Sequence, residues 1–265
     1  MAKPTFKANP IQVQVPATSA NLGPGFDAFG LAFSLHDRYV AQILDEGGLD
    51  IDVTGEGADE LPRNEKHLLV KAMYKGFDFL GGKPKGLAVR ALNVIPHGRG
   101  LGSSAAAIIG GLVLARSLVL TGTDKMSDTQ LLNLATEMEG HPDNVAAALF
   151  GGATVAWTTD VKAGQRADAI HLPVDPRIQV MAFIPATSKL GAVYTDTGAV
   201  ALRYTVIDGQ TRKVVTHFAR NGFFYTLDRT NGKFLKAAQR MSRLLMFHHF
   251  RMRWIKLWMF QDLEN

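Results

Sequence analysis

The stretch GRGLGSSAAAIIGG, from Gly98 to Gly111, is the most informative segment of this chain. Three glycines and two serines precede a run of small apolar residues, and the loop contains no lysine. The pattern predicts a glycine-rich loop followed by a helix from Ser103 to Leu120. Because small and aliphatic residues occupy every side of that helix, we expect it to be buried on most sides.

A loop of this kind can hold an anion. A helix amino terminus exposes unpaired N–H groups at the positive end of the helix dipole, and glycines ahead of it allow close approach. The loop lacks the Walker pattern, because Ser103-Ser104 stand where a Lys-Ser/Thr pair would close it. It also lacks the dinucleotide fingerprint. We therefore predict a phosphate site in which Mg²⁺, held by a serine hydroxyl and a carboxylate, replaces the lysine. The alternative is a glycine-rich turn packed against a neighbouring strand.

A second polar cluster lies near the amino end, in PATSANLGPGFDAFG, from Pro16 to Gly30. Its density of Gly, Pro, Ser and Asn predicts a loop after a strand that begins at Ile11. Asn21 and Asp27 are polar groups that a simple connector would not need. The structural alternative for Asn21 is a left-handed turn.

A third cluster, EMEGHPDN, from Glu137 to Asn144, lies where a predicted helix breaks. Glu139, His141 and Asn144 are candidates for chemistry. The structural alternatives are an N-cap role for Asp143 and a hydrogen-bonded loop histidine at His141.

Strands and helices alternate along the rest of the body, which predicts an α/β or α+β fold. The predicted strands are Ile11–Val15, Tyr39–Leu44, Leu49–Thr54, Gly86–Ile95, Ala153–Thr158 and Ile178–Ile184. The predicted helices, besides the one at Ser103, are Asn64–Leu80 with an asparagine cap, Ser127–Glu139 with a serine cap, and Val145–Phe150.

Composition places the chain among ordinary globular proteins. Of its 265 residues, 46% are hydrophobic and 20% charged, and it has no cysteine, which excludes disulfides and thiolate metal sites. The amino end lacks the apolar segment of a signal peptide, and Ala105–Ala115 is too short to span a bilayer. These features predict a cytoplasmic enzyme.

The net charge of +5 comes from the end of the chain. Residues 1–202 contain 17 Lys and Arg against 20 Asp and Glu, whereas residues 203–265 contain 12 against 4. The basic character therefore says nothing about what the body binds.

Together, the loop from Pro16, the segment GLGSSAA and the segment EGHPDN resemble the GHMP small-molecule kinases in order and spacing. Within that family the combination looks most like the homoserine kinases, over roughly the first 190 residues. The resemblance implies an α+β fold (an α/β sandwich): a GHMP-kinase, ribosomal S5-like N-terminal domain with a left-handed crossover and an incomplete or atypical C-terminal domain.

The function that the resemblance implies is ATP-dependent phosphorylation of the hydroxyl of L-homoserine, a step of threonine biosynthesis, with ATP and Mg²⁺ as cofactors. It also implies a small-molecule substrate, no nucleic acid, no membrane and a homodimer. Phosphoryl transfer depends more on in-line geometry and charge neutralisation than on a strong base.

The resemblance also implies roles for individual residues. Catalytic roles fall to Asp27 and Glu139, with Asp27 orienting the attacking hydroxyl or acting as a weak base. The substrate would be bound by Asn21, Asp27, His141, Asn144 and Thr187. The nucleotide would be bound by Asn64, Pro96, Gly98, Arg99, Gly100, Leu101, Gly102, Ser103, Ser104, Ala105 and Ala106. The metal would be held by Ser103, Ser104 and Glu139.

The likeness fails after about Ala186. An arginine expected about where Gly191 stands, to pair with the substrate carboxylate, is absent. We therefore divide the chain into a nucleotide-binding N-terminal domain at 1–160, the start of a truncated C-terminal domain at 161–203, and an unrelated tail at 204–265.

The tail resembles another kind of protein. Thr205–Ala237 looks like a strand-turn-strand piece of a pyrroloquinoline quinone-dependent alcohol dehydrogenase propeller. By residue pattern it predicts two or three strands, with Phe223, Tyr225 and Leu227 on one face and a hairpin turn at Asn231-Gly232. The last 25 residues predict a basic amphipathic helix, which could dock on the fold, bind a membrane or be unselected sequence.

Two alternatives to an active homoserine kinase remain. One is a chimeric module that binds nucleotide but is catalytically impaired, because the second domain and the expected arginine are missing. The other is a GHMP kinase that acts on a different small molecule.

Overall fold

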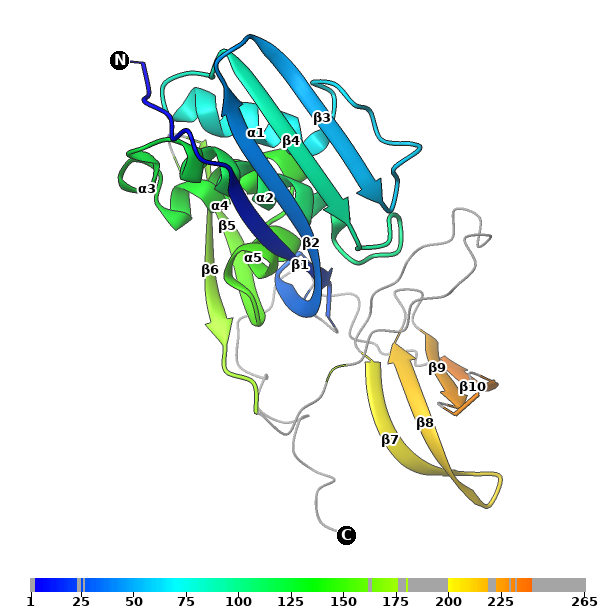
Figure 1. The fold of residues 1–265 in the computed structure, drawn as a ribbon. Helices are drawn as coiled ribbons and strands as arrows, with labels where there is room; N and C mark the ends of the chain where they lie inside the picture. Colours follow the sequence, from blue (N-terminus) through cyan, green and yellow to red (C-terminus); the bar gives the residue numbers. More distant parts are fainter. Residues whose placement is uncertain are drawn as a thin grey trace.

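The computed structural model describes residues 3–175 except 23, 24, 26, 162 and 163, then residue 180, and further on 200–218, 223–228, 230–231 and 233–239. These residues form a six-stranded sheet with helices on one face and a second, four-stranded sheet (Figure 1). In this part of the chain, no helix combines the length and apolar character needed to cross a membrane.

The body contains strands and helices in mixed order, as the sequence predicts. Its strands are β1 (Ile11–Ala20), β2 (Phe29–Leu44), β3 (Gly48–Gly55), β4 (Gly86–Asn93), β5 (Ala153–Val161) and β6 (Gly164–Leu172). Its helices are α1 (Leu68–Phe79), α2 (Ser103–Leu118), α3 (Gly122–Lys125), α4 (Asp128–Glu139) and α5 (Pro142–Phe150).

The long strand β2 organises the sheet, whose order is β3-β4-β2-β5-β6 with β1 on β2. Along one edge β2 pairs antiparallel with β1, from Ile11↔Ala41 to Ala20↔Gly30. Along its other edge it pairs with β5 near its start and with β4 near its end. Strands β3 and β4 are parallel neighbours joined through α1. Both ends of β1 and β2 are thereby fixed within one sheet.

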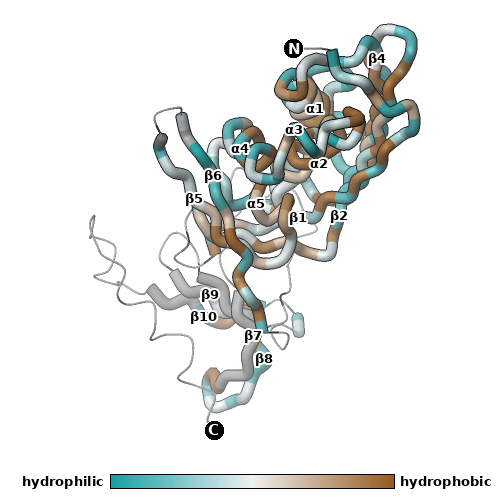
Figure 2. The backbone as a smooth tube through the Cα atoms, turned by 90° about the vertical axis from the view of Figure 1, so that its left-hand side faces the viewer, coloured by the Kyte–Doolittle hydropathy of each residue, from teal (hydrophilic) through white to brown (hydrophobic). Residues whose placement is uncertain are grey.

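Helix α2 lies at the centre of the hydrophobic core and is buried on most sides, as the sequence predicts. It packs closely on α1, because a Cβ added at Gly111 would lie 2.5 Å from the carbonyl oxygen of Leu69. Hydrophobic residues concentrate in α1, α2 and the strands beside them (Figure 2). The small residues of the quoted stretch therefore allow the helices to approach one another and the sheet.

The predicted helix at Asn64 begins later than expected. Helix α1 starts at Leu68, and its N-cap is His67, whose Nδ1 accepts a hydrogen bond from the N–H of Leu69. The Asn64 cap was wrong, because Asn64 belongs to a preceding turn. Its Oδ1 accepts from the N–H of Lys66, and its carbonyl accepts from the N–H of His67.

The predicted loop from Pro16 to Gly30 is also shorter than expected. Strand β1 continues to Ala20 and β2 begins at Phe29, with a bulge between Pro16 and Thr18. Burial explains the difference, because Thr18 is fully buried and its small neighbours pair with β2. Similarly, α5 begins at Pro142 rather than Val145, since proline is favoured in the first helical turn.

Helix α4 begins where the sequence predicts. The Ser127 hydroxyl accepts from the N–H of Gln130, and the Gln130 side chain accepts from the N–H of Ser127, which completes a capping box. We expect Ser127→Ala to lower the free energy of unfolding by about 1 kcal/mol, because the N–H of Gln130 loses the hydroxyl that accepts its hydrogen bond. Urea unfolding would measure this. Thr129→Ala, an exposed change in the same turn, is the control and should stay within about 0.5 kcal/mol of the parent. Equal losses in the two variants would contradict the capping role.

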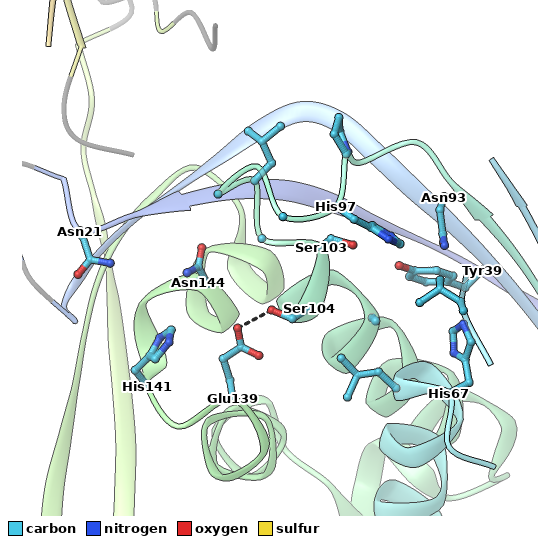
Figure 3. Close-up of a pocket in the computed structure, with 18 residues that line it drawn as sticks. Asn21, Tyr39, His67, Asn93, His97, Ser103, Ser104, Glu139, His141 and Asn144 are labelled. Carbon is cyan, nitrogen blue, oxygen red and sulfur yellow. Dashed lines mark hydrogen bonds between the residues drawn. The ribbon is translucent and has the colours of Figure 1, made fainter. Parts of the chain in front are cut away.

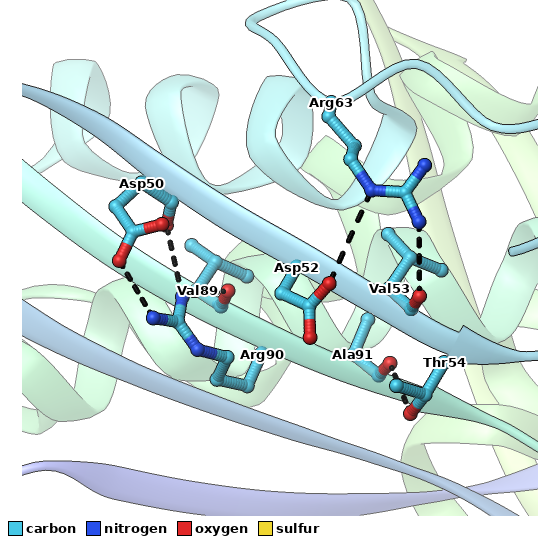
Figure 4. A network of polar contacts seen from close by, with 8 residues as sticks. All are labelled: Asp50, Asp52, Val53, Thr54, Arg63, Val89, Arg90 and Ala91. Carbon is cyan, nitrogen blue, oxygen red and sulfur yellow. Dashed lines mark hydrogen bonds and ion pairs between the residues drawn. The ribbon is translucent and has the colours of Figure 1, made fainter.

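Ion pairs cross the solvent-facing side of β3 and β4 (Figure 4). Arg90 lies 2.6 Å from Asp50, and Arg63 lies 4.0 Å from Asp52 and donates to the carbonyl of Val53. These side chains are about half exposed. Exposed pairs contribute about 0 to 1 kcal/mol each, so the fold depends on its core rather than on this network.

The second sheet contains four antiparallel strands in the order β10-β9-β8-β7, more than the two or three predicted. They are β7 (Val200–Ile207), β8 (Gln210–Phe218), β9 (Phe223–Asp228) and β10 (Phe234–Gln239). Asp208 and Gly209, with φ of 53° and 75°, make the tight hairpin between β7 and β8. Strand β6 continues the first sheet past the boundary predicted at residue 160. The predicted terminal helix and the strand Ile178–Ile184, apart from Val180, lie outside the described residues.

Candidate functional site

The glycine loop connects β4 to α2 and presents the uncapped start of that helix. Gly98, Gly100 and Gly102 have φ of 64°, 66° and 69°, a left-handed conformation that side chains disfavour. Gly102 is the N-cap of α2, and no side chain caps the helix there. The first N–H groups of α2 are therefore directed at the space in front of the loop, which is the arrangement that binds phosphates.

A buried carboxylate anchors the start of this loop. Asp37 is fully buried and accepts hydrogen bonds from the N–H groups of Val94, at 2.6 Å, and Ile95, at 2.8 Å. It also accepts from the hydroxyl of Tyr39 at 2.9 Å. Burial, followed by the Asp37 charge and this bond, raises the pKa of Tyr39 well above its usual value. Asp37 thereby holds the chain just ahead of Pro96.

Thr18, near the end of β1, ties the loop to α5. Its N–H donates to the carbonyl of Leu101 at 2.9 Å, and its hydroxyl donates to Oδ1 of Asn144 at 2.8 Å. A Cβ added at Gly102 would lie 1.9 Å from the Thr18 hydroxyl oxygen. The alternative of a glycine turn packed against a strand therefore describes Gly102 correctly, while the exposed helix start still allows an anion to bind.

The break between α4 and α5 brings Glu139 to the start of α2. Gly140, with φ of 95°, ends α4, and α5 follows at Pro142. Glu139 therefore points across to α2, where the hydroxyl of Ser104 donates to Oε1 of Glu139 at 2.6 Å (Figure 3). Hydroxyl and carboxylate oxygens are the ligands that Mg²⁺ prefers, so the donor set fits this ion.

His141 and Asp143 form a second polar pair in the same turn. Nδ1 of His141 lies 2.5 Å from Oδ1 of Asp143, which is fully buried and also accepts from the N–H of Asn144. The hydrogen bond to Asp143 raises the pKa of His141 against the opposing effect of burial, and the charges of Asp143, Glu139 and Asp27 act in the same direction. The surroundings thus favour a cationic His141 beside the cavity.

One cavity of about 590 Å³ is lined by the glycine loop, by Ser104 and Glu139, and by His141 and Asn144. Figure 3 shows Asn21, His141 and Asn144 toward one end, Ser104 and Glu139 between, and Tyr39, His67, Asn93 and His97 toward the other. The sequence-predicted residues that line it are Asn21, Pro96, Gly98, Gly100, Leu101, Gly102, Ser103, Ser104, Glu139, His141 and Asn144.

Other predicted site residues lie elsewhere. Asp27 is exposed at a turn with φ of 52°, where its N–H donates to Oδ1 of Asn21. Asn64 and Arg99 do not line the cavity, and Ala105 and Ala106 are buried in the core beneath it. Thr187 and Gly191 lie outside the described residues.

Sequence reasoning missed the far end of the cavity. Its lining residues there are Tyr39, Leu61, His67, Leu68, Asn93, His97 and Ala107. Asn93 offered a usable signal, because it is a polar residue that ends a buried strand immediately before the glycine loop. In the described part of the chain, no group of three or more His, Asp or Glu side chains could hold a metal on its own.

Part of the chain matches a known protein family. Residues 67–152 match the family of GHMP kinases N terminal domain. The chain is 52% identical over 190 residues to a homoserine kinase of Streptomyces avermitilis, which covers 72% of this chain and 61% of that protein. It is 48% identical over 172 residues to a homoserine kinase of Mycobacterium tuberculosis, which covers 64% of this chain and 54% of that protein. The chain thus spans about 60% or less of the length of these curated relatives.

Among solved structures, the chain is similar to a homoserine kinase from Cytophaga hutchinsonii, with a TM-score of 0.53 and 29% identity. The match covers 68% of this chain and 60% of that one. Residues 67–152 therefore match the amino-terminal domain of the GHMP kinases, and the six-stranded body that contains them has the GHMP kinase fold.

Proposed function

We propose that this chain transfers the γ-phosphoryl group of ATP to the side-chain hydroxyl of L-homoserine, giving ADP and O-phospho-L-homoserine, in the cytoplasm. One observation carries the proposal: the uncapped start of α2 and the Ser104–Glu139 pair open onto the same cavity as Asn21, His141 and Asn144. The similarity to homoserine kinases favours this substrate over other small alcohols.

The phosphates of ATP would lie against the glycine loop, where the N–H groups of α2 and the helix dipole stabilise negative charge. Ser103, Ser104 and Glu139 would hold Mg²⁺. When bound, that ion would neutralise phosphate charge, which a loop without lysine otherwise leaves to the backbone. The short Ser104–Glu139 contact supports this assignment, because it already places a hydroxyl and a carboxylate together.

The amino acid would occupy the end of the cavity lined by Asn21, His141 and Asn144. The Thr18 hydroxyl donates to Oδ1 of Asn144, and the side-chain nitrogen of Asn144 would donate toward an acceptor oxygen of the substrate. Asp27 lies close enough to influence His141, and we retain it as a group that orients the hydroxyl. Catalysis would then come from alignment and charge stabilisation.

The first experiment is ADP release from Mg-ATP by the purified, folded chain, with and without L-homoserine. We expect release that depends on homoserine and is absent with L-2-aminobutyrate, which has the same carbon chain but no hydroxyl. Mevalonate and galactose as substrates would separate this function from those of other GHMP kinases.

A second candidate is a module that binds ATP without transferring its phosphate, because the chain spans only about 60% of its relatives. In that case ATP would raise the midpoint of thermal unfolding, by mass action, while homoserine would cause no ADP release.

A further inference from the structure

The far end of the cavity has a composition unlike that of the rest. Its polar side chains are Tyr39, His67, Asn93 and His97, and apolar groups of Leu61, Leu68 and Ala107 lie among them. Figure 3 shows the four polar side chains gathered on the side of α2 away from Asn21 and His141. Apolar walls with a few fixed polar groups are typical of pockets for flat ring systems.

His67 is held there as a hydrogen-bond donor. It is 3% exposed, and its Nδ1 accepts the N–H of Leu69 as the N-cap of α1. A neutral imidazole that accepts through Nδ1 carries its proton on Nε2. Burial, and then the nearby His97, lower the pKa of His67, so the neutral form is favoured.

Within the described residues, the Nε2 atom of His67 is buried and has no hydrogen-bond partner. Its polar neighbours differ, since the Tyr39 hydroxyl donates to Asp37 and the Asn93 amide donates to the carbonyl of Glu56. Buried donors in folded proteins nearly always have partners. A buried donor without one in the wall of a cavity therefore indicates a contact with a ligand.

We propose that His67 binds the nucleobase of the nucleotide, with its Nε2–H donating to an acceptor nitrogen of the adenine ring. This rests on the proposed function, which places the phosphates at the start of α2 and the acceptor alcohol at the opposite end. Because Nε2 is covered in this structure, the base reaches it only after a neighbouring side chain is displaced. Adenine presents acceptor nitrogens at N1, N3 and N7. Guanine keeps the acceptors N3 and N7 but carries a proton on N1, so only a bond to N1 would exclude guanine.

Two substitutions separate the donor from the helix cap. His67→Ser keeps a hydroxyl that can cap α1 but removes the Nε2 donor, whereas His67→Gln keeps a donor near the Nε2 position and weakens the cap. Calorimetric titration of the full chain with Mg-ATP and with magnesium tripolyphosphate gives two dissociation constants. Their difference reports the contribution of the nucleoside, because tripolyphosphate has no base. We expect His67→Ser to weaken ATP binding about tenfold and to leave tripolyphosphate binding within about twofold, with His67→Gln closer to the parent.

Binding of 1-deaza-, 3-deaza- and 7-deaza-ATP identifies the acceptor atom, because each analogue replaces one ring nitrogen of adenine with a C–H group. One of these should bind the parent about tenfold more weakly than ATP and should show no further loss with His67→Ser, as a double-mutant cycle requires. Thermal unfolding of both variants reports whether α1 remains folded.

The proposal is overturned if His67→Ser binds ATP as the parent does, or if ATP and tripolyphosphate weaken equally. It is also overturned if the cycle shows no coupling with any deaza analogue. Failure of the proposed function looks different: base-dependent ATP binding would persist, while homoserine would cause no ADP release.

Discussion

Glu139→Gln should reduce homoserine-dependent ADP release about 1,000-fold while leaving the fold intact. The carboxylate of Glu139 faces the Ser104 hydroxyl at 2.6 Å, at the start of the helix that would hold the phosphates. The amide keeps the size and the hydrogen bond but removes the charge that would bind Mg²⁺. Steady-state turnover at saturating ATP and homoserine measures the effect.

Glu137→Gln is the matched control. Glu137 lies two residues earlier on α4, is exposed, and pairs with Lys75 on α1 at 2.8 Å. The same change of charge on the same helix should alter turnover less than about twofold, because an exposed pair contributes little. Similar losses in both variants would show that the charge of the helix, and not a specific ligand, matters.

Asp37→Ala should lower the free energy of unfolding by about 4 kcal/mol, the largest loss of stability that we expect from a single polar substitution. The fully buried carboxylate accepts from the N–H groups of Val94 and Ile95 and from the hydroxyl of Tyr39. Removing it leaves these buried donors without a partner. Urea unfolding monitored by circular dichroism measures the change.

Two further variants make this result specific. Asp37→Asn retains an acceptor oxygen and should lose about half as much stability. Asp50→Ala removes an aspartate from the same sheet whose side chain is 58% exposed and paired with Arg90, and should lose no more than about 1 kcal/mol. A loss for Asp50→Ala as large as that for Asp37→Ala would contradict the anchoring role.

Local signals predicted some elements well. The start of α4 follows from Ser127 and Gln130, which are adjacent on the helix and need no distant partner. Likewise, the small residues after Ser103 predict a buried helix whatever surrounds it. In both cases the residues themselves contain the physical cause.

Elements that depend on distant partners were harder to predict. Strand β1 runs through Ala20 because it pairs with β2, although its sequence there is typical of a loop. Strand β6 was missed, because Arg166 and Asp168 give it a polar outer face and its partner β5 defines it. Histidine is not a favoured cap, so the start of α1 at His67 could not be inferred from cap preference alone.

The candidate site also contains one part that was predicted from the sequence and one part that was not. The residue pattern singled out the glycine loop and the segment from Glu139 to Asn144, and the resemblance gave them roles. The fold places both segments beside one cavity. The far end is built from Tyr39 and Asn93, on strands where only the register decides which side chains face inward. Tyr39 and Asn93 line the same cavity only because β2 and β4 pair in this register.

The three pairings of β2 also determine when this site can exist during synthesis. The first residues of β2 pair with Ala153–Val155, which are synthesised much later. The hydrogen bond between Thr18 and Asn144 spans 126 positions. Contacts of such separation slow folding, because a long loop must close before they form. A ribosome must therefore release the chain through β5 before the sheet can close. Until then, part of one edge of β2 remains open to pair with another nascent chain.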